Sequence, residues 1–537
     1  MSVLRWTTLL LLVKFSSQSA CGDTHSTGDC NCQWHLDGTW VVDCTGRGLS
    51  ELPEGIPVNT TYLDASKNNI LEIPNDTLLR LQYLNIIVLD FNNLTSLPKF
   101  PKGIRVISAN YNSIQSIDGA FDDLSALVRV GLDGNNVTFI NNRTFKDTMD
   151  LRQLKISSNN IKYIQPNTFK TIKNLTSIWI RSNNFDTIEK NTFALHGSIS
   201  CSLYIDYTGI KEIKTGSFRN IGVMSKVSLG FNSIKHLPPR FINSSYLYQL
   251  VLSYNKLQHI DPEAFAEVGK IMVLRLDNNL IKEIPLAVYN LNVTSLLIIS
   301  MNFIDLSSYG NRSVLAHSPQ KLIIAKNEIQ SISRNHFNGL QSLEQILIYL
   351  NRISYIEDRS FSGTSLTYLY IYGNNLQKIT SEMFKVDIGS LQYLYLFNNP
   401  IEDMEQGTLS YLAPKSTVYL NCANLEYIPS KIAEHTNAIC VTNKTVLDFK
   451  VDYFSTLYLF GMTCTGPTCQ PCGLGSYGKL SGSGCYTCPA VKGTKVCFPE
   501  AAYSEVQMTS KPQKKTSEQH NTLSQNKGRN LTCSLQL

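Results

Sequence analysis

The feature that most constrains this chain is a pattern that recurs along most of its length. In Leu151-x-x-Leu154-x-Ile156-x-x-Asn159, apolar residues and one asparagine stand at a fixed spacing that returns many times. A period of this kind predicts stacked repeats, whose hydrophobic core grows with every added unit. The asparagine position, with steps of 23 to 25 residues and one step of 20, runs through Asn68, Asn92, Asn112, Asn135, Asn159, Asn183, Thr208, Asn232, Asn255, Asn279, Asn302, Asn327, Asn351, Asn374, Asn399 and Ala423.

The spacing within one unit predicts a short strand followed by a closed turn. Alternating apolar residues place one face of the strand in the core, and strands of adjacent units then pair as a parallel sheet. The asparagine is expected to turn inward at the end of the strand, where its amide can bond backbone groups that burial would otherwise leave unpaired. Thr208 can supply only part of this bonding and Ala423 none, so we expect local irregularity at both.

The second half of each unit carries a recurring phenylalanine, which we interpret as packing of the outer half of the core in a stacked spine. Its members are Phe121, Phe145, Phe169, Phe193, Phe218, Phe241, Phe265, Phe337, Phe361 and Phe384.

The unit resembles the "typical" extracellular leucine-rich repeat of about 24 residues, shared by Toll-like receptor ectodomains, Slit proteins and the variable lymphocyte receptors of jawless vertebrates. The resemblance extends roughly from Cys21 to Cys440. It implies an α/β leucine-rich-repeat solenoid with a curved parallel sheet on the concave face and with loops and short helical turns on the convex side. It is specific for the fold and says little about the ligand.

An open solenoid exposes apolar core at both ends and needs caps. Four cysteines near the start, Cys21, Cys30, Cys32 and Cys44, resemble the N-terminal cysteine cap of this class. Their spacing alone permits three disulfide arrangements. The resemblance implies the pairs Cys21–Cys32 and Cys30–Cys44.

The C-terminal end departs from the family pattern. A divergent last repeat is expected to close through Cys422 and Cys440, and a second module follows with Cys469-x2-Cys472 and Cys485-x2-Cys488. This module resembles the small Cys-rich repeats beside ephrin-receptor ligand domains. Its cysteines could instead hold zinc, but an exported chain favours disulfides.

Several features predict passage through the secretory route. Arg5, the apolar run 9–13 and small residues up to Ala20 are typical of a signal peptide, and no later segment is long enough to span a membrane. We expect a secreted chain, or one held at the cell surface if a longer form carries an anchor. Glycosylation sequons occur at Asn59, Asn75, Asn93, Asn136, Asn142, Asn174, Asn243, Asn292, Asn311, Asn443 and Asn530.

The expected organisation is a signal peptide at 1–20, a Cys cap at 21–57, repeats at 58–412, a divergent final repeat at 413–445, a connector at 446–463, the Cys-rich module at 464–499 and a disordered polar tail at 500–537. Cys201 and Cys533 have no evident partner. We interpret Cys201 as a small buried hydrophobe.

The strand positions that face away from the core are expected to form the binding surface. Every residue four before the asparagine is apolar or aromatic after Arg275, and the columns two and six before it also become aromatic. The predicted concave ligand-binding residues are Tyr349, Tyr368, Tyr370, Tyr372, Tyr393, Tyr395, Phe397 and Tyr419. Tyrosine is also a good strand former, but clustering in three columns favours binding. No sequon falls between Asn311 and Asn443.

The N-terminal half of the same face is mixed in charge, with residues such as Asp90, Lys155, Arg181 and Asp206, and we interpret it as an ordinary solvated surface.

These patterns predict a binding protein for an extracellular protein ligand, receptor-like or soluble. The alternative is a structural adhesion or matrix protein, in which self-association is possible. The nine histidines are dispersed and no catalytic motif is recognised, so we expect no enzyme activity. We also expect no cofactor, no metal site and no nucleic-acid partner.

Overall fold

The computed structural model describes residues 20–21, 29–197, 200–310, 312–386, 391–405, 408, 412 and 416–420, and the backbone of four short strands between 436 and 496. The chain divides into two compact units, Met1–Cys440 and Val441–Leu537. Each is described by itself.

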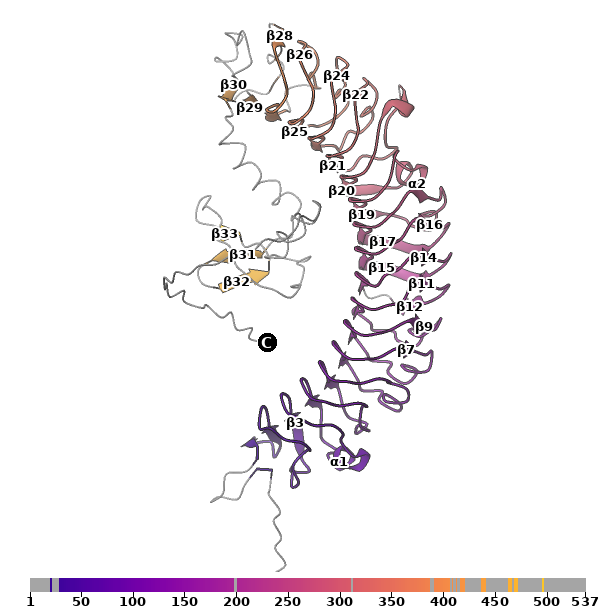
Figure 1. Ribbon diagram of the computed structural model, residues 1–537, viewed down its shortest axis with the longest axis vertical. Coiled ribbons are helices and arrows are strands. Elements are labelled where there is room, and N and C mark those ends of the chain that lie inside the picture. The colour runs from indigo at the N-terminus through magenta and orange to yellow at the C-terminus, as the bar shows by residue number, and fades with distance from the viewer. Residues whose placement is uncertain are drawn as a thin grey trace, which may run out of the picture. The chain divides into compact units, whose positions relative to one another are not determined.

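The first unit is a solenoid whose main sheet lines the inner side of its arc (Figure 1). The sheet opens with an antiparallel pair, β1 (Asn31–Trp34) and β2 (Trp40–Asp43), and is parallel from β2 onward. Its further strands are β3 (Thr60–Asp64), β4 (Ile86–Val88), β5 (Val106–Ser108), β6 (Arg129–Gly131), β8 (Gln153–Lys155), β10 (Ser177–Trp179), β12 (Phe193–Gly197), β13 (Cys201–Tyr204), β15 (Phe218–Ser228), β17 (Ile242–Val251), β19 (Ile271–Arg275), β20 (Val293–Ile298), β21 (Lys321–Ile323), β23 (Gln345–Leu347), β25 (Tyr368–Tyr370), β27 (Tyr393–Tyr395), β29 (Ser416–Leu420) and β30 (Thr436–Cys440).

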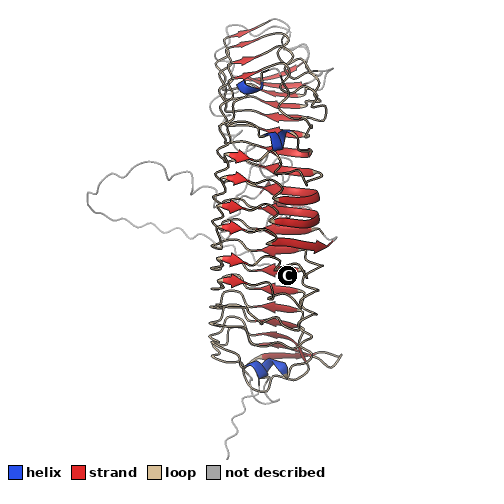
Figure 2. Ribbon diagram, turned by 90° about the vertical axis from the view of Figure 1, so that its right-hand side faces the viewer, coloured by secondary structure: helices blue, strands red, loops and turns tan. Residues whose placement is uncertain are grey.

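The outer side carries a second column of two-residue strands, which Figure 2 shows beside the main sheet. They pair in parallel as β7 (Phe139–Ile140) with β9 (Tyr163–Ile164), β11 (Thr187–Ile188) with β14 (Glu212–Ile213), β16 (His236–Leu237) with β18 (His259–Ile260), β22 (Ser331–Ile332) with β24 (Tyr355–Ile356), and β26 (Lys378–Ile379) with β28 (Asp403–Met404). The described helices are short: α1 (Asn75–Leu79), α2 (Leu286–Tyr289) and the 3-10 turn η1 (Ser307–Tyr309).

The phenylalanine spine packs the outer half of the core, as the sequence predicts. Neighbouring rings lie between 5.3 Å (Phe193–Phe218) and 6.3 Å (Phe361–Phe384) apart, centroid to centroid. The spine is interrupted between Phe265 and Phe337, in the region of α2 and η1. The smaller buried side chains Val288 and Val314 occupy the core there.

The inward asparagine links each coil to the one before it, and Asn159 illustrates the arrangement. Its Nδ2 donates to the Ile156 and Ser157 carbonyls of its own turn at 3.2 and 3.1 Å. It also donates to the Leu132 carbonyl of the preceding coil at 2.8 Å, and its Oδ1 accepts the Val137 N–H at 3.0 Å. The same bond to a preceding carbonyl is made by Asn68, Asn92, Asn112, Asn135, Asn183, Asn232, Asn255, Asn279, Asn302, Asn327, Asn351, Asn374 and Asn399.

The residue just before each of these positions adopts a left-handed backbone conformation, from Lys67 (φ 57°) to Asn398 (φ 54°). Glycine occupies this position only at Gly134 and Gly373. A Cβ on Gly134 would come within 2.6 Å of the Tyr111 ring, so close packing by the neighbouring coil adds to the need for glycine there.

Thr208 keeps the turn but changes its hydrogen bonds. Its hydroxyl donates to the Ile205 carbonyl at 3.1 Å and to Asn232 Oδ1 at 2.9 Å, which links it to the following coil. The irregularity expected at Thr208 is not found in the turn, where Tyr207 keeps the left-handed conformation of its counterparts (φ 58°). A register shift does occur earlier in this repeat, between Cys201 and Ser202 at the start of β13. Ala423 lies outside the described residues.

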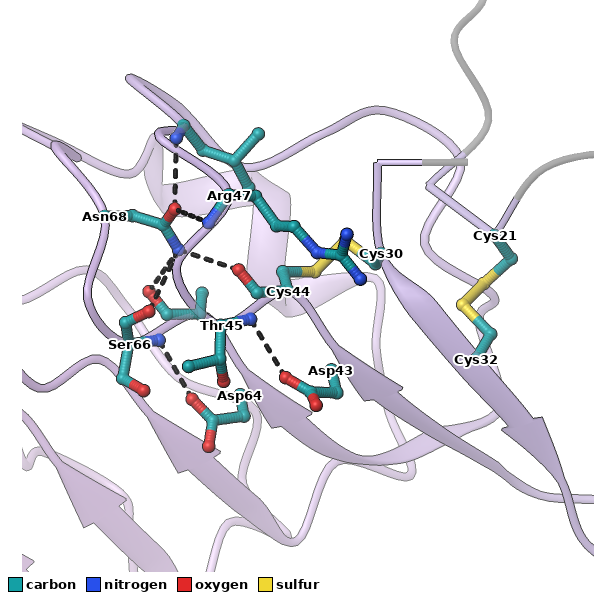
Figure 3. The surroundings of a disulfide bond; sticks show 12 residues. Cys21, Cys30, Cys32, Asp43, Cys44, Thr45, Arg47, Asp64, Ser66 and Asn68 are labelled. Carbon is teal, nitrogen blue, oxygen red and sulfur yellow. Dashed lines mark hydrogen bonds between the residues drawn. A yellow bond between two sulfur atoms is a disulfide. The ribbon is translucent and has the colours of Figure 1, made fainter. Parts of the chain in front are cut away.

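The N-terminal cap is closed by the disulfides Cys21–Cys32 and Cys30–Cys44, which confirms the implied pairing (Figure 3). The Cys44 carbonyl accepts a hydrogen bond from Asn68 Nδ2 at 2.8 Å. The cap is therefore bonded to the first inward asparagine as if it were one more coil.

The second unit contains one described sheet, in which β31 (Met462–Thr465) pairs antiparallel with β32 (Thr468–Pro471) and with β33 (Lys495–Val496). The expected disulfides of Cys422, Cys440, Cys469, Cys472, Cys485 and Cys488 involve side chains outside the described residues. Across the described part of the chain, no helix is long and apolar enough to cross a membrane.

We predict that Asn159→Ala lowers the free energy of unfolding by roughly 1–3 kcal/mol, because buried backbone groups lose their partner. Asn160→Ala is the matched control, since Asn160 is the next residue and is exposed; its effect should stay within about 0.5 kcal/mol. Urea titration of both variants measures the difference. Equal midpoints would contradict the role given to the inward amide.

Cys201 is a buried free thiol, and burial raises its pKa to about 12. Because the thiolate is the reactive form, we predict that iodoacetamide at pH 8 leaves Cys201 unmodified in the folded chain and modifies it after denaturation. Mass spectrometry of the peptide that contains Cys201 makes the comparison. Labelling at equal rates in both states would show that the thiol is accessible.

Candidate binding face

Three rows of side chains run across the inner face of the main sheet, six, four and two residues before each inward asparagine. We call them the first, middle and turn rows. Their C-terminal ends form the tyrosine face, which consists of Tyr349, Tyr368, Tyr370, Tyr372, Tyr393, Tyr395, Phe397 and Tyr419.

The strands orient the first and middle rows away from the solenoid core. In β25 and β27 the central residues Leu369 and Leu394 are completely buried in the core. Side chains alternate across a strand, so the flanking tyrosines of both strands point to the inner face, where they are partly exposed.

Register pairing brings the tyrosines of these two rows ring to ring. Tyr370 pairs with Tyr395, and Tyr395 with Tyr419. The corresponding ring centroids are 4.3 and 4.5 Å apart, with planes within 7°. In the first row, Tyr368 and Tyr393 stack at 4.7 Å. The tyrosine rings of the first and middle rows are therefore positioned by the strands and by stacking on one another.

The turn row continues the aromatic surface just beyond the strands. Tyr372 stacks on Tyr349 at 4.6 Å and on Phe397 at 4.5 Å. Tyr349 and Phe397 are only 3% and 1% exposed. The turn row is thus more deeply placed than the surface position that its sequence pattern suggests.

Apolar residues extend the face toward the middle of the solenoid. Ile298, Ile323 and Leu347 are register neighbours in the middle row, just before Tyr370. All three are almost fully buried, yet they stand outside the hydrophobic core cluster. They form a second apolar layer on the inner side of the sheet.

The N-terminal part of the face is polar and bonded to itself. Asp206 Oδ2 accepts Arg181 Nε at 3.0 Å, and Asp206 Oδ1 accepts Ser228 Oγ at 2.5 Å. The Arg181 guanidinium lies 4.7 Å from the Tyr204 ring, which stacks on Trp179 at 5.5 Å. Asp206 is buried and hydrogen-bonded to Arg181 and Ser228, so the interpretation of this residue as solvated is wrong.

Two buried lysines of the first row were missed by the sequence reasoning. Burial lowers the pKa of Lys226 to about 7, and nearby Asp206 partly opposes that shift. Burial alone lowers the pKa of Lys321 to about 8. Their position in the repeat could have identified them, since Lys226 and Lys321 each stand six residues before an inward asparagine.

A further aromatic set lies in the left-handed row, one residue before the asparagines. Phe231 stacks on Tyr207 at 4.4 Å and on Tyr254 at 4.3 Å, and Phe91 stacks on Tyr111 at 4.6 Å. The sequence gives little sign of this row, because glycine, the usual mark of a left-handed backbone, is mostly absent from it.

Sequon asparagines in the described ranges stand outside the three rows. Four of them, Asn75, Asn93, Asn136 and Asn142, are exposed, and Asn59, Asn174, Asn243 and Asn292 are partly buried. Within the same ranges, no group of three or more His, Cys, Asp or Glu side chains is placed to hold a metal ion.

Comparison with known families returns the repeat itself. A "Leucine rich repeat" family model matches residues 245–304 and 320–376, and a "BspA type Leucine rich repeat region (6 copies)" model matches 103–223. Among solved structures, the Toll–Spatzle complex, described as a molecular hub in Drosophila development and innate immunity, aligns with a TM-score of 0.56 and 18% identity. The alignment covers 72% of this chain and 56% of that one, and shows a shared fold.

Curated relatives match over short segments. Leucine-rich repeat-containing G-protein coupled receptor 5A of Xenopus laevis is 42% identical over 79 residues, which are 14% of this chain and 9% of the receptor. The receptor 5 of Rattus norvegicus is 47% identical over 72 residues, 13% of this chain and 8% of the receptor. Human leucine-rich repeat-containing protein 4 is 36% identical over 80 residues, 15% of this chain and 12% of the relative. The chain therefore spans about a tenth of the length of these relatives.

The relatives, the disulfides and the shared fold are consistent with an extracellular protein that takes part in protein interactions. The period of the sequence, the stacked coils and the matches to the repeat models show that the chain is a leucine-rich-repeat protein.

Proposed function

We propose that this chain is an extracellular recognition protein, receptor-like or soluble, which binds a protein ligand on the tyrosine face. One observation carries the proposal: aromatic rings stack in three adjacent rows, two of them register-paired on the strands of one sheet and the third just beyond those strands, with centroid separations of 4.3 to 4.7 Å. No other part of the described inner face combines aromatic side chains in all three rows.

The tyrosine face suits binding because little conformational entropy is lost when a ligand binds to it. A tyrosine offers a large amphipathic area with two side-chain torsions. Here these torsions are already restricted by stacking, and the strand backbone is fixed by the neighbouring coils. Less ordering is required on binding, so more of the contact energy contributes to affinity.

Similar proteins and features elsewhere in the sequence support the same assignment. The Toll structure is that of a complex with Spatzle, and two of the relatives are named as receptors. The predicted signal peptide and sequons would take the chain through the secretory route, and the stretch between Asn311 and Asn443 would be free of N-linked glycans.

Stacked tyrosines could instead serve only to stabilise the sheet, and a triple substitution separates the two roles. We predict that Tyr370→Ser, Tyr395→Ser and Tyr419→Ser together reduce ligand binding at least tenfold, because central aromatic contacts dominate protein interfaces. Wild-type and variant chains are compared on an array of purified extracellular domains, with thermal unfolding of each recorded alongside.

A matched control replaces three aromatic residues of the outer strands, Phe139, Tyr163 and Tyr355, by serine. All three are exposed, so binding should survive their replacement. Equal binding by the inner triple variant would contradict the proposal. Light scattering that shows self-association through the same tyrosines, with no array partner, would favour an adhesion protein instead.

A further inference from the structure

Lys321 lies on the inner face within the apolar layer. In β21 its neighbour Leu322 is completely buried in the core, so Lys321 and Ile323 face the opposite side of the sheet. Lys321 is only 8% exposed. Its register partners are Leu296 on β20 and Gln345 on β23, and none of the three β-strands carries an acidic residue.

The Lys321 ammonium has no counter-charge in the described part of the chain. Its pKa is lowered to about 8 by burial alone, with no contribution from a neighbouring carboxylate. The two arginines of this face that lie beside carboxylates are Arg181, paired with Asp206, and Arg275, paired with Asp277. The pKa of the other buried lysine of this row, Lys226, is influenced by the Asp206 carboxylate, whereas that of Lys321 is not influenced by any carboxylate.

Lys321 is not fully buried, since 8% of the residue is exposed. Among described residues, the fully buried side-chain nitrogen and oxygen atoms that lack a hydrogen-bond partner are Ser177 Oγ, Thr192 Oγ1, Arg219 Nε and Ser416 Oγ. Lys321 Nζ is not one of them. Lysines commonly cover the aliphatic stem and keep the charged end toward solvent, where a bound group can reach it.

The first row leads from this charge to the aromatic rings. From Lys321 it passes through Gln345 to Tyr368 and Tyr393. Adjacent strands are about 4.8 Å apart, so β21, which carries Lys321, lies roughly 10 Å from β25, which carries Tyr368. One extended peptide segment can span both.

We propose that Lys321 is the charge anchor of the tyrosine face, and that the protein partner presents a carboxylate beside aromatic or aliphatic side chains. The inference rests on the proposed function and specifies its ligand. An unpaired ammonium in apolar surroundings gains a charge-assisted hydrogen bond when a carboxylate arrives. Partners without the acid leave that charge desolvated, so the lysine discriminates among otherwise similar apolar segments.

Binding should depend on pH in a defined direction. A bound carboxylate favours the charged amine and raises the pKa of Lys321 above its value in the free chain. Above pH 8 the amine of the free chain is mostly neutral, so binding of an acidic segment requires uptake of a proton. The affinity for such a segment therefore falls as the pH rises from 7 to 9. Of the groups packed near Lys321 on β20 and β23, none titrates in this interval.

A displayed library of random twelve-residue peptides tests the inference with the full chain. We expect peptides selected on wild type to combine aromatic or aliphatic residues with Asp or Glu. Lys321→Met should weaken such a peptide about 30-fold or more, the loss that follows removal of one buried charge partner. The same peptide with its acid changed to the amide should bind wild type more weakly than the acid does, because it leaves the Lys321 charge desolvated, and should bind Lys321→Met at least as well as it binds wild type. Lys282→Met, at an exposed lysine, is the control.

The outcomes separate this inference from the proposed function. Selected peptides that need Tyr370, Tyr395 and Tyr419 but show no acidic preference, or bind Lys321→Met unchanged, would overturn the role of Lys321 and leave the face intact. Peptides that still bind the triple tyrosine variant, or a library that yields none, would count against the face itself. Methionine keeps the length and apolar character of the stem, so thermal unfolding should show that Lys321→Met remains folded.

Discussion

The inward asparagine is the interaction on which the rest of this solenoid depends. Each coil turns sharply after its strand, and the turn buries backbone groups that have no partner within the coil. One amide bonds the carbonyls of its own turn and also a carbonyl and an N–H of the preceding coil, as Asn159 does with Leu132 and Val137. Burial of leucines alone would hold the coils together without fixing how far one could slide along the next, because hydrophobic contact is not directional.

Because the register between neighbouring coils is fixed, residues at the same distance before each inward asparagine form a row across the sheet. Residues that stand four before successive asparagines become neighbours across the sheet, so a repeated choice of side chain becomes a continuous surface. As far as Asp277 the turn row carries acids such as Asp206 and Asp277, which accept hydrogen bonds from the serines of neighbouring coils. In the C-terminal half the same row carries Tyr349, Tyr372 and Phe397, which stack. The same coil accommodates both sets of side chains, although the acids also accept backbone N–H groups, as Asp206 does from Gly230.

The periodic part of this structure could be predicted from sequence because the spacing reports it directly. Repeat boundaries, the phenylalanine spine and the row positions of Tyr370, Tyr395 and Tyr419 all follow from counting. The left-handed residue before each asparagine could not be found this way, because serine, lysine and bulky aromatics occupy it as well as glycine. Depth was equally hidden: the pattern places Tyr349 and Phe397 on the inner side but does not show that they are buried.

Lys321 was missed for a related reason. A single lysine among mixed first-row residues has no periodicity, and its meaning comes only from what surrounds it. In the structure those surroundings are Leu296, Ile323 and Leu347, with no acid on the adjacent strands. Aromatic rows supply contact area that many partners could use, whereas an unpaired charge in an apolar setting penalises every partner without a matching acid. Affinity and selectivity would then come from different residues of one rigid face. The aromatic residues that give affinity can be found from the sequence repeat, whereas the lysine that gives selectivity breaks the repeat and is recognised only in the structure.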